Sequence, residues 1–200
     1  IFASTSSVYG DLKNYPLKEE MNTDKPLSFY AASKKTNEVM AYSYCNIYKL
    51  PITGLRFFTV YGPYGRPDMS LFLFVKSIMQ KRKIKLFNNG NHIRDFTYID
   101  DVVNSIEKLL LKSSKKTIPY QIFNIASGNP INLKKFIKLI ENKLGILAKT
   151  TNYKLQLGDV VKTHGDISKL KKINNIKFSN KIDKGIFKFI SWYKKYYKNK

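Results

Sequence analysis

Hydrophobic and polar positions follow two alternating patterns along the chain. Short apolar runs that end in Gly, Pro or Ser/Thr are typical of buried strands, and apolar residues three and four apart are typical of helices. The apolar runs predict strands at 1–4, 51–63, 84–90 and 120–127. The helical spacing predicts helices at 27–50, 70–83, 100–112, 132–145 and 183–197. Strands that alternate with helices predict an α/β fold with a parallel sheet.

Two helix ends have clear signals. Ser28 precedes the first predicted helix and is a suitable N-cap, and Gly145 follows the fourth. An α/β nucleotide binder normally opens with a strand and a G-x-G-x-x-G turn, and this sequence contains no such motif. We therefore expect the chain to be the C-terminal part of a longer protein.

Composition and charge narrow the class of protein. The 200 residues are 43% hydrophobic and 14% aromatic, which is typical of a folded domain with a core. The net charge of +22 comes almost entirely from lysine, whereas sites that bind phosphate or guanine favour arginine. We interpret it as a solvated lysine surface. A basic nucleic-acid-binding module remains an alternative, and its binding should weaken steeply with salt.

Several features predict a cytoplasmic protein that does not bind membranes. No apolar run approaches the roughly 20 residues that span a bilayer, and the first residues lack the pattern of a signal peptide. Cys45 is the only cysteine, so no internal disulfide is expected. Cys45, His92 and His164 lack metal-ligand spacing, and we predict no metal site.

The stretch "YAASKK" raises a chemical hypothesis. Tyr30 and Lys34 are four apart, so they lie on one face of the predicted helix. A nearby ammonium favours a phenolate, which makes Tyr30 a candidate acid/base. The hydroxyl cluster "STSSVYG" at 4–10 follows a strand, where parallel sheets bind ligands. The cluster is either a turn cap or a set of hydroxyls that bind a polyol and relay a proton.

Four motifs occur in a characteristic order: "STSSVYG" at 4–10, "YAASKK" at 30–35, "LRFFTVYGPYGRPDM" at 55–69 and "RDFTYIDDV" at 94–102. In this order and spacing they resemble the extended short-chain dehydrogenase/reductase family, and in particular its UDP-glucuronate 4-epimerases. The resemblance implies the C-terminal part of a Rossmann-like, doubly wound parallel sheet with a smaller α/β substrate-binding lobe.

The resemblance also implies a domain organisation. Residues 1–62 would be the C-terminal part of the NAD-binding Rossmann domain, with 94–127 returning to it, and 63–93 and 128–200 would form mainly the substrate-binding lobe. Full-length family members suggest a homodimer in which the helix of Tyr30 packs against its neighbour.

The family pattern implies a catalytic triad of Thr5, Tyr30 and Lys34. Tyr30 would take the proton of the sugar 4-hydroxyl while a hydride passes from C4 to NAD. Lys34 would bind the nicotinamide ribose and favour the phenolate. The keto sugar would turn over and take the hydride back, which epimerises C4.

Residue choice narrows the implied reaction. Related dehydratases resemble "TDEVYG" at this turn and decarboxylases "TSEVYG", because removing a C5 proton and water needs carboxyl groups. Ser6 and Ser7 occupy those positions here and favour simple epimerisation of a substrate that bears a carboxylate. Thr59 and Arg66 match positions that contact the sugar, and an arginine fork suits a carboxylate. A solvated loop arginine is the alternative for Arg66.

The UDP part of the substrate has its own candidates by the same resemblance. Arg94 would bind the diphosphate, Phe87 would pack on uracil, and Asp159 would bind the uridine ribose. The alternatives are a core position for Phe87, a pair between Arg94 and Asp95, and a turn role for Asp159.

Two further enzyme and binding alternatives stay open. The first is a UDP-sugar decarboxylase or dehydratase of the same family. The second is a non-catalytic UDP-sugar-binding remnant, because none of these motifs belongs to the first half of the Rossmann domain, which would hold the NAD pyrophosphate. The closing helix carries apolar residues on one face, and we expect it to dock on the substrate lobe rather than on a membrane surface.

Overall fold

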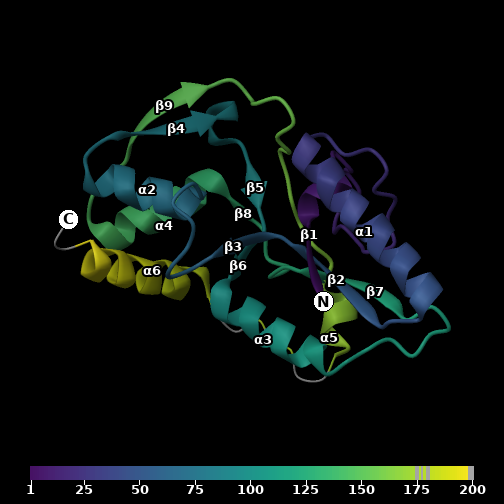
Figure 1. Cartoon of the computed structure of the whole chain (residues 1–200). Coiled ribbons are helices and arrows are strands. Elements are labelled where there is room, and N and C mark those ends of the chain that lie inside the picture. Colours follow the sequence, from purple (N-terminus) through teal and green to yellow (C-terminus); the bar gives the residue numbers. More distant parts are fainter. Residues whose placement is uncertain (174–175, 177, 179–180, 198–200) are drawn as a thin grey trace.

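The computed structural model describes residues 1–173, 176, 178 and 181–197. Figure 1 shows two parts, with α1, β1, β2 and β7 in one and α2, α4, α6, β4 and β9 in the other. The strands are β1 (Phe2–Thr5), β2 (Ile52–Phe57), β3 (Thr59–Tyr61), β4 (Lys83–Phe87), β5 (Ile93–Arg94), β6 (Phe96–Tyr98), β7 (Tyr120–Ile125), β8 (Ile131–Asn132) and β9 (Lys149–Tyr153). The helices are α1 (Phe29–Tyr48), α2 (Ser70–Met79), α3 (Ile99–Leu110), α4 (Leu133–Leu144), α5 (Ser168–Lys171) and α6 (Ile182–Tyr196), with 3₁₀ turns η1 (Ser6–Tyr9) and η2 (Asn88–Gly90).

The first part is built on a parallel three-stranded sheet in the order β1-β2-β7. Leu55 of β2 pairs with Ala3 on one side and with Phe123 on the other. Its core continues through α3 and α5, which supply Leu109 and Leu170. The predicted α/β fold with a parallel sheet is confirmed.

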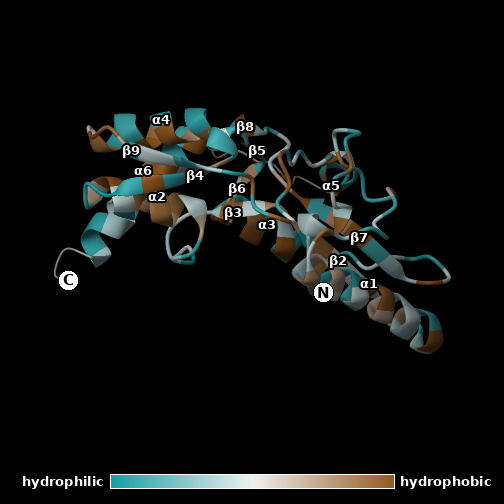
Figure 2. Ribbon diagram, turned by 90° about the horizontal axis from the view of Figure 1, so that it is seen from above, coloured by the Kyte–Doolittle hydropathy of each residue, from teal (hydrophilic) through white to brown (hydrophobic). Residues whose placement is uncertain are grey.

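The sequence patterns predicted one strand at 51–63. This prediction was wrong, because the segment forms two strands, β2 and β3. The Phe58 amide donates to the Ile125 carbonyl (3.0 Å), whereas the next amide, that of Thr59, donates to the Asp95 carbonyl (3.2 Å). The chain thus changes partners at Phe58, and β3 pairs with β6 instead of β7. Figure 2 shows β3, β6 and α3 between the two parts, so this switch leads the chain from one part into the other.

Helix α1 begins as the sequence predicts. The Ser28 hydroxyl accepts a hydrogen bond from the Ala31 amide (3.1 Å) and caps the helix. Ala31, Glu38 and Cys45 are the buried residues of α1, and most of its other side chains are exposed. Glu38, a charged residue, is therefore buried between Ala31 and Cys45 on the face of α1 that packs against the sheet.

The second part forms around a separate hydrophobic core between α2, α4, α6 and the parallel pair β4–β9. Phe136 of α4 stacks on Phe96 of β6 with ring centroids 4.0 Å apart. Helix α6 buries Ile186, Phe189 and Ile190 in this core, which confirms that the closing helix docks on this part of the molecule. Helix α4 ends at Gly145, as predicted, in the left-handed conformation.

Strand β9 and helix α5 lie in stretches for which the sequence patterns predicted no element. Helix α5 packs against β7, so it lies with the parallel sheet although it follows β9 in sequence. The predicted division into two domains stays a prediction. Residues 174–175, 177, 179–180 and 198–200 of the predicted substrate-binding lobe lie outside the described residues. In the part of the chain that the structure describes, no helix has the length and apolar character needed to cross a membrane.

Candidate active site

A cavity of about 640 Å³ lies at the carboxyl ends of β1 and β2, where open parallel sheets bind ligands. The N-terminal turn of α1 and the loop after β3 complete its wall. Many of the predicted site residues line it together: Thr5, Ser6, Ser7, Tyr30, Lys34, Thr59 and Arg66. Residues that are up to 61 positions apart in sequence thus share one cavity, as an active site requires.

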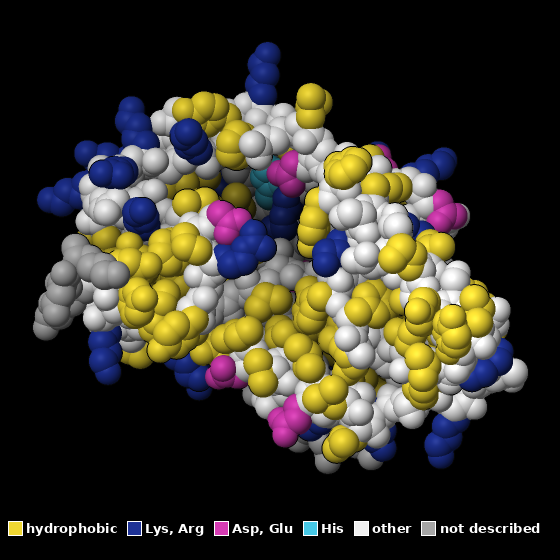
Figure 3. All heavy atoms as spheres, in the orientation of Figure 1, with side chains coloured by type: hydrophobic (Ala, Val, Ile, Leu, Met, Phe, Trp, Pro, Cys, Tyr) yellow, Lys and Arg dark blue, Asp and Glu magenta, His cyan; other side chains and the backbone are white. Residues whose placement is uncertain are grey.

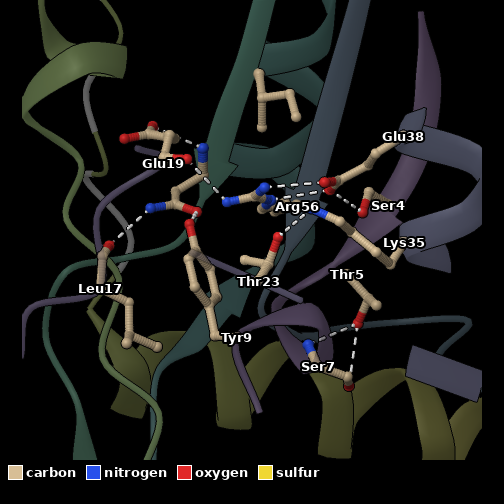
Figure 4. A network of polar contacts seen from close by, with 12 residues as sticks. Ser4, Thr5, Ser7, Tyr9, Leu17, Glu19, Thr23, Lys35, Glu38 and Arg56 are labelled. Atoms are coloured by element: carbon tan, nitrogen blue, oxygen red, sulfur yellow. Dashed lines mark hydrogen bonds and ion pairs between the residues drawn. The ribbon is translucent and has the colours of Figure 1, made fainter. Parts of the chain in front are cut away.

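The hydroxyl cluster after β1 forms a tight turn. The Thr5 hydroxyl accepts from the Ser7 amide and donates to the Ser7 hydroxyl, each at 3.2 Å, as Figure 4 shows. Thr5 thereby caps the 3₁₀ turn η1. The turn-cap alternative is therefore present in the structure, and because Thr5 also lines the cavity, the cap fixes the position of a hydroxyl that faces a ligand.

Tyr30 and Lys34 enter the same cavity from the first turns of α1. Tyr30 is 54% exposed, so its ring is open to a ligand. The Lys34 ammonium donates to the Ala3 carbonyl at 3.2 Å. This bond ties α1 to β1 two residues before Thr5, which brings the three predicted catalytic residues to one wall.

A buried ion pair, which the sequence reasoning did not identify, holds α1 against the sheet behind this wall. Arg56 Nε and Nη2 donate to Glu38 Oε1 and Oε2, both at 2.9 Å, and the Ser4 hydroxyl donates to Oε1 at 2.6 Å (Figure 4). Glu38 is one helical turn beyond Lys34, and Ser4 precedes Thr5. We call Ser4, Glu38 and Arg56 the helix anchor, because they join α1 to both β1 and β2.

The helix anchor extends into a second layer of hydrogen bonds. The Arg56 guanidinium lies 4.8 Å from the centre of the Tyr9 ring, and the Tyr9 hydroxyl donates to Asn124 Oδ1 at 2.7 Å. Burial raises the pKa of Tyr9 to about 12, more than the nearby charge of Arg56 lowers it. Tyr9 is therefore a neutral hydrogen-bond donor, unlike the exposed Tyr30.

Arg56 itself stays charged inside the protein. Burial opposes its charge most strongly, but the hydrogen bonds that Arg56 donates to Glu38 and the negative charge of Glu38 outweigh burial and raise the pKa of Arg56 above its ordinary value. A signal for the anchor was available in the sequence, since Arg56 interrupts the apolar run "GLRFF". An arginine inside a buried strand needs a buried partner.

The loop after β3 presents Arg66 to the cavity. Its Nε donates to Asp68 Oδ1 at 3.1 Å, and both side chains are exposed. The hydrogen bond from Arg66 is the main cause that holds the pKa of Asp68 below its ordinary value. Arg66 is thus a loop arginine that already pairs with one carboxylate at the rim of the cavity.

Arg94 and Asp159, which are 65 residues apart, form a second polar group. Arg94 Nη2 donates to Asp159 Oδ1 at 2.9 Å, and Nη1 donates to the Val161 carbonyl at 3.0 Å. His92 completes the group, because its Nε2 lies 3.1 Å from Asp159 Oδ2. We call His92, Arg94 and Asp159 the charged cluster; the sequence reasoning predicted Arg94 and Asp159 as site residues but assigned no role to His92.

The suggested pair between Arg94 and Asp95 does not form. Asp95 instead accepts hydrogen bonds from the Ser127 amide (2.9 Å), the Ser127 hydroxyl (2.6 Å) and the Gly165 amide (3.1 Å). Neighbouring residues on a strand point to opposite faces. Asp95 therefore joins loops inside the protein, and Arg94 is left to Asp159.

Phe87 lies apart from the residues that line the cavity. It ends β4, and its ring centroid is 5.6 Å from that of Tyr153 on the paired strand β9. It is partly buried, so one side of the ring is covered by β9. Its role in packing on uracil stays a prediction. No group of three or more His, Cys, Asp or Glu side chains in the described part of the chain is arranged to hold a metal ion.

Comparison with known proteins gives consistent matches. The model of the family described as "NAD dependent epimerase/dehydratase family" matches residues 1–126. "Protein CapI" of Staphylococcus aureus is 44% identical over 99% of this chain and 64% of its own length, and a "Probable UDP-glucuronate 4-epimerase" of Rhizobium meliloti is 38% identical over 99% and 62%. A crystal structure of UDP-glucuronic acid 4-epimerase from Bacillus cereus, in complex with UDP-glucuronic acid and NAD, has a TM-score of 0.91 at 31% identity and covers 98% of this chain and 61% of that chain.

The chain thus spans less than two thirds of the length of these relatives.

Proposed function

The chain belongs to the NAD dependent epimerase/dehydratase family, and from this premise we propose that it forms the catalytic and substrate-binding part of an NAD-dependent UDP-sugar 4-epimerase that converts UDP-glucuronate to UDP-galacturonate. The observation that carries the proposal is the single cavity that holds Thr5, Tyr30, Lys34 and Arg66. Relatives and solved structures named as UDP-glucuronate 4-epimerases support the choice of substrate.

Tyr30 is the residue that moves the proton in this proposal. Its exposed ring at the cavity wall can approach the 4-hydroxyl of a bound sugar, and the hydroxyl turn of Thr5 and Ser7 offers a partner for the same sugar oxygen. Once the proton has left, Tyr30 holds it until the 4-keto group is reduced from the other face. The same group thus serves as base and then as acid.

The residues present fit the nicotinamide end of NAD. Lys34 is anchored to the Ala3 carbonyl and reaches the cavity beside Tyr30, so its ammonium is placed to donate to ribose hydroxyls. Apolar side chains of Phe57, Val60 and Ile99 also line the cavity and can exclude water from a ring. When bound, NAD supplies a reversible hydride acceptor for C4.

The absence of carboxyl groups supports epimerisation over elimination. Among the described residues that line the cavity, none is Asp or Glu. A dehydratase needs an acid and a base besides the tyrosine, whereas inversion at C4 needs neither. Ser6 and Ser7 leave room for a C5 carboxylate without like-charge repulsion, and Arg66 can exchange Asp68 for that carboxylate.

We propose that the UDP part binds beside the charged cluster. Arg94 would donate to the diphosphate, Asp159 would accept from the uridine ribose, and Phe87 would pack on uracil. Their support is the ion pair that brings Arg94 and Asp159 together, and the hollow between the two parts of the molecule that is visible in Figure 3. Basic (dark blue), acidic (magenta) and histidine (cyan) side chains lie side by side at that hollow.

The assembly and location of the full-length protein are also proposals. Large apolar residues are exposed along α1, namely Val39, Met40, Tyr44, Ile47 and Tyr48. Figure 2 shows such hydrophobic positions along this helix, and they support a homodimer in which α1 packs against a neighbouring helix. The buried free thiol of Cys45 agrees with a cytoplasmic location.

Proton NMR of the full-length protein incubated with UDP-glucuronate tests the function. The expected result is a second anomeric signal, that of UDP-galacturonate, which grows to a constant ratio. Release of carbon dioxide would identify a decarboxylase, and a stable 4-keto product a dehydratase. Turnover of UDP-glucose alone would move the assignment to an epimerase of neutral sugars. Absorbance of bound NAD(H) at 340 nm checks the cofactor, and its absence together with UDP-sugar binding would indicate a non-catalytic binder.

A further inference from the structure

The charged cluster contains a buried imidazole that the proposed reaction does not use. We propose that His92 is a third residue of the diphosphate subsite, which holds Asp159 in place when Arg94 turns to the diphosphate and takes up a proton as that anion binds. This inference rests on the proposed function, because it takes a nucleotide diphosphate as the ligand of Arg94.

The geometry gives Asp159 two different nitrogen partners. Arg94 contacts Oδ1 at 2.9 Å, and His92 Nε2 lies 3.1 Å from Oδ2. His92 is 3% exposed, whereas the Asp159 side chain is 32% exposed and so is partly open to solvent. The imidazole therefore reaches Asp159 from inside the protein, and a ligand reaches it from outside.

The backbone fixes His92 and Arg94 on one face. His92 directly precedes strand β5 and is separated from Arg94 by Ile93, and the side chains of His92 and Arg94 both reach Asp159. The Ile93 amide donates to the Val161 carbonyl and the Ile93 carbonyl accepts from the Thr163 amide, each at 3.0 Å. The Leu133 amide donates to the His92 carbonyl at 2.8 Å. With the strand held on both sides, the backbone of Arg94 is fixed, and its guanidinium is held by Asp159 and by the Val161 carbonyl.

The charges favour a neutral His92 before a ligand binds. Burial is the main cause that lowers the pKa of His92, the positive charge of Arg94 lowers it further, and Asp159 opposes both. Near neutral pH the imidazole is then uncharged, and its buried Nε2, 3.1 Å from Asp159 Oδ2, makes no well-aligned hydrogen bond in this state. The charged cluster as a whole is neutral in this state, with one guanidinium and one carboxylate.

Other charged groups around the cluster are few in the described part of the chain. Tyr15 lies near Arg94, and burial raises the pKa of Tyr15, so it stays neutral. The Lys162 ammonium lies over the Tyr15 ring at 4.3 Å from its centre. Lys134, in the first turn of α4, packs near Gly90, two residues before His92. These cations add positive charge that attracts a diphosphate.

A bound diphosphate changes this balance. A UDP-sugar carries two negative charges, and Arg94 cannot serve both the phosphate and Asp159 with the same Nη2. When Arg94 turns away, Asp159 loses one donor and faces a dianion of like charge. A proton on His92 restores an opposite charge at hydrogen-bond distance from Asp159, which raises the proton affinity of the imidazole. Proton uptake and nucleotide binding then strengthen each other, as linkage requires.

Isothermal titration calorimetry of the full-length protein with UDP-glucose tests the inference. UDP-glucose has the diphosphate diester, which does not titrate near neutral pH, and lacks the glucuronate carboxylate. Repeating the titration at pH 7 in buffers of different ionisation enthalpy counts the protons. We expect binding to take up a fraction of one proton. The Kd should increase as the pH rises, by at most about tenfold per pH unit.

The variants His92→Gln and His164→Gln form a matched pair. His92→Gln should remove the proton uptake and flatten the pH dependence of Kd, and His164→Gln should leave both unchanged. An NMR titration of the His92 imidazole in the wild-type protein does not depend on whether a variant folds. The pKa of His92 should rise when UDP-glucose is added.

The outcomes separate the two proposals. Binding of UDP-glucose without proton uptake in the wild-type protein, or with equal uptake in His92→Gln, would overturn the role of His92 and leave the proposed function intact. Absence of UDP-glucose binding by the wild-type protein would overturn the UDP-sugar site itself, and the role of His92 with it.

Discussion

The wall around Tyr30 and the charged cluster around Arg94 hold their polar groups in opposite ways. At the wall, Tyr30 is open to a ligand, and the strong ion pair lies behind it in the helix anchor. In the charged cluster, the residues that would bind the ligand are paired with each other. The difference suggests that a reacting group is kept available and positioned from behind, whereas binding groups exchange internal partners for the ligand.

The largest effect is expected at the wall. Tyr30→Phe removes the phenol oxygen that takes the proton in the proposed mechanism and should lower kcat about 10²- to 10⁴-fold. Because the Tyr30 side chain is 54% exposed, stability should change little. Steady-state kinetics with UDP-glucuronate measures the loss, and calorimetry with UDP-glucose checks that binding is retained. Tyr44→Phe, also exposed on α1, is the control; equal activity of the two variants would remove Tyr30 from the mechanism.

The helix anchor should be the most sensitive point for stability. Glu38→Gln leaves Arg56 buried without its carboxylate, and breaking a buried ion pair costs about 3–5 kcal/mol of unfolding free energy. The urea midpoint of the full-length protein measures it. Glu107→Gln, on the exposed face of α3, should stay near wild type. If the two midpoints agree, α1 is held by other contacts than the anchor.

These two regions also differ in how far the sequence revealed them. The strands before and after α1, the Ser28 cap and the parallel sheet follow from local patterns, because periodicity and capping are local effects. The change of partner at Phe58 could not be predicted, since an apolar run does not show which strand each amide will meet. The anchor pair joins residues 18 apart and the Arg94–Asp159 pair residues 65 apart. Neither pair was predicted, because long-range pairs leave no local pattern; the family resemblance supplied Arg94 and Asp159 only as separate substrate-binding residues.

His92 shows what local reasoning can still miss. It was considered only as a metal ligand and set aside for its spacing. His92 directly precedes strand β5, two residues before Arg94, and in extended backbone this spacing puts two side chains on one face. The signal was therefore present, but its meaning depended on Asp159, which arrives from a loop 67 residues away.

The charged cluster should respond to Arg94→Gln through substrate binding rather than chemistry. Hydrogen bonds to charged groups contribute roughly 1.5–3 kcal/mol, so KM for UDP-glucuronate should rise about 10- to 100-fold with kcat largely kept. Initial rates over a range of substrate concentrations separate the two constants. Arg82→Gln, an exposed arginine before β4, is the matched control. A fall in kcat at unchanged KM would place Arg94 with the reacting groups and undo the comparison.

A smaller effect is expected at Asp68, where the cavity wall resembles the charged cluster in having a paired arginine. Asp68→Asn releases Arg66 from its carboxylate partner. Exposed ion pairs contribute little, so KM for UDP-glucuronate should fall by less than about fivefold, and KM for UDP-glucose should not change. Parallel kinetics with the two substrates reveal the ratio. A rise in KM for UDP-glucuronate would mean that Asp68 orients Arg66 instead of competing for it.

The smallest expected effect is a pH dependence of stability that belongs to the charged cluster alone. The pKa of His92 is lower in the folded protein than in the unfolded chain, mainly because of burial. The unfolded chain therefore binds more protons as the pH falls through about 6.5, the ordinary value for histidine, and the folded state loses stability there. The urea midpoint should fall less between pH 7 and pH 5 in His92→Gln than in wild type. Because Arg94 contributes to the low pKa of His92, saturating UDP-glucose should reduce the same loss in the wild-type protein. A ligand that stabilises equally at both pH values would show that the imidazole and the nucleotide bind independently.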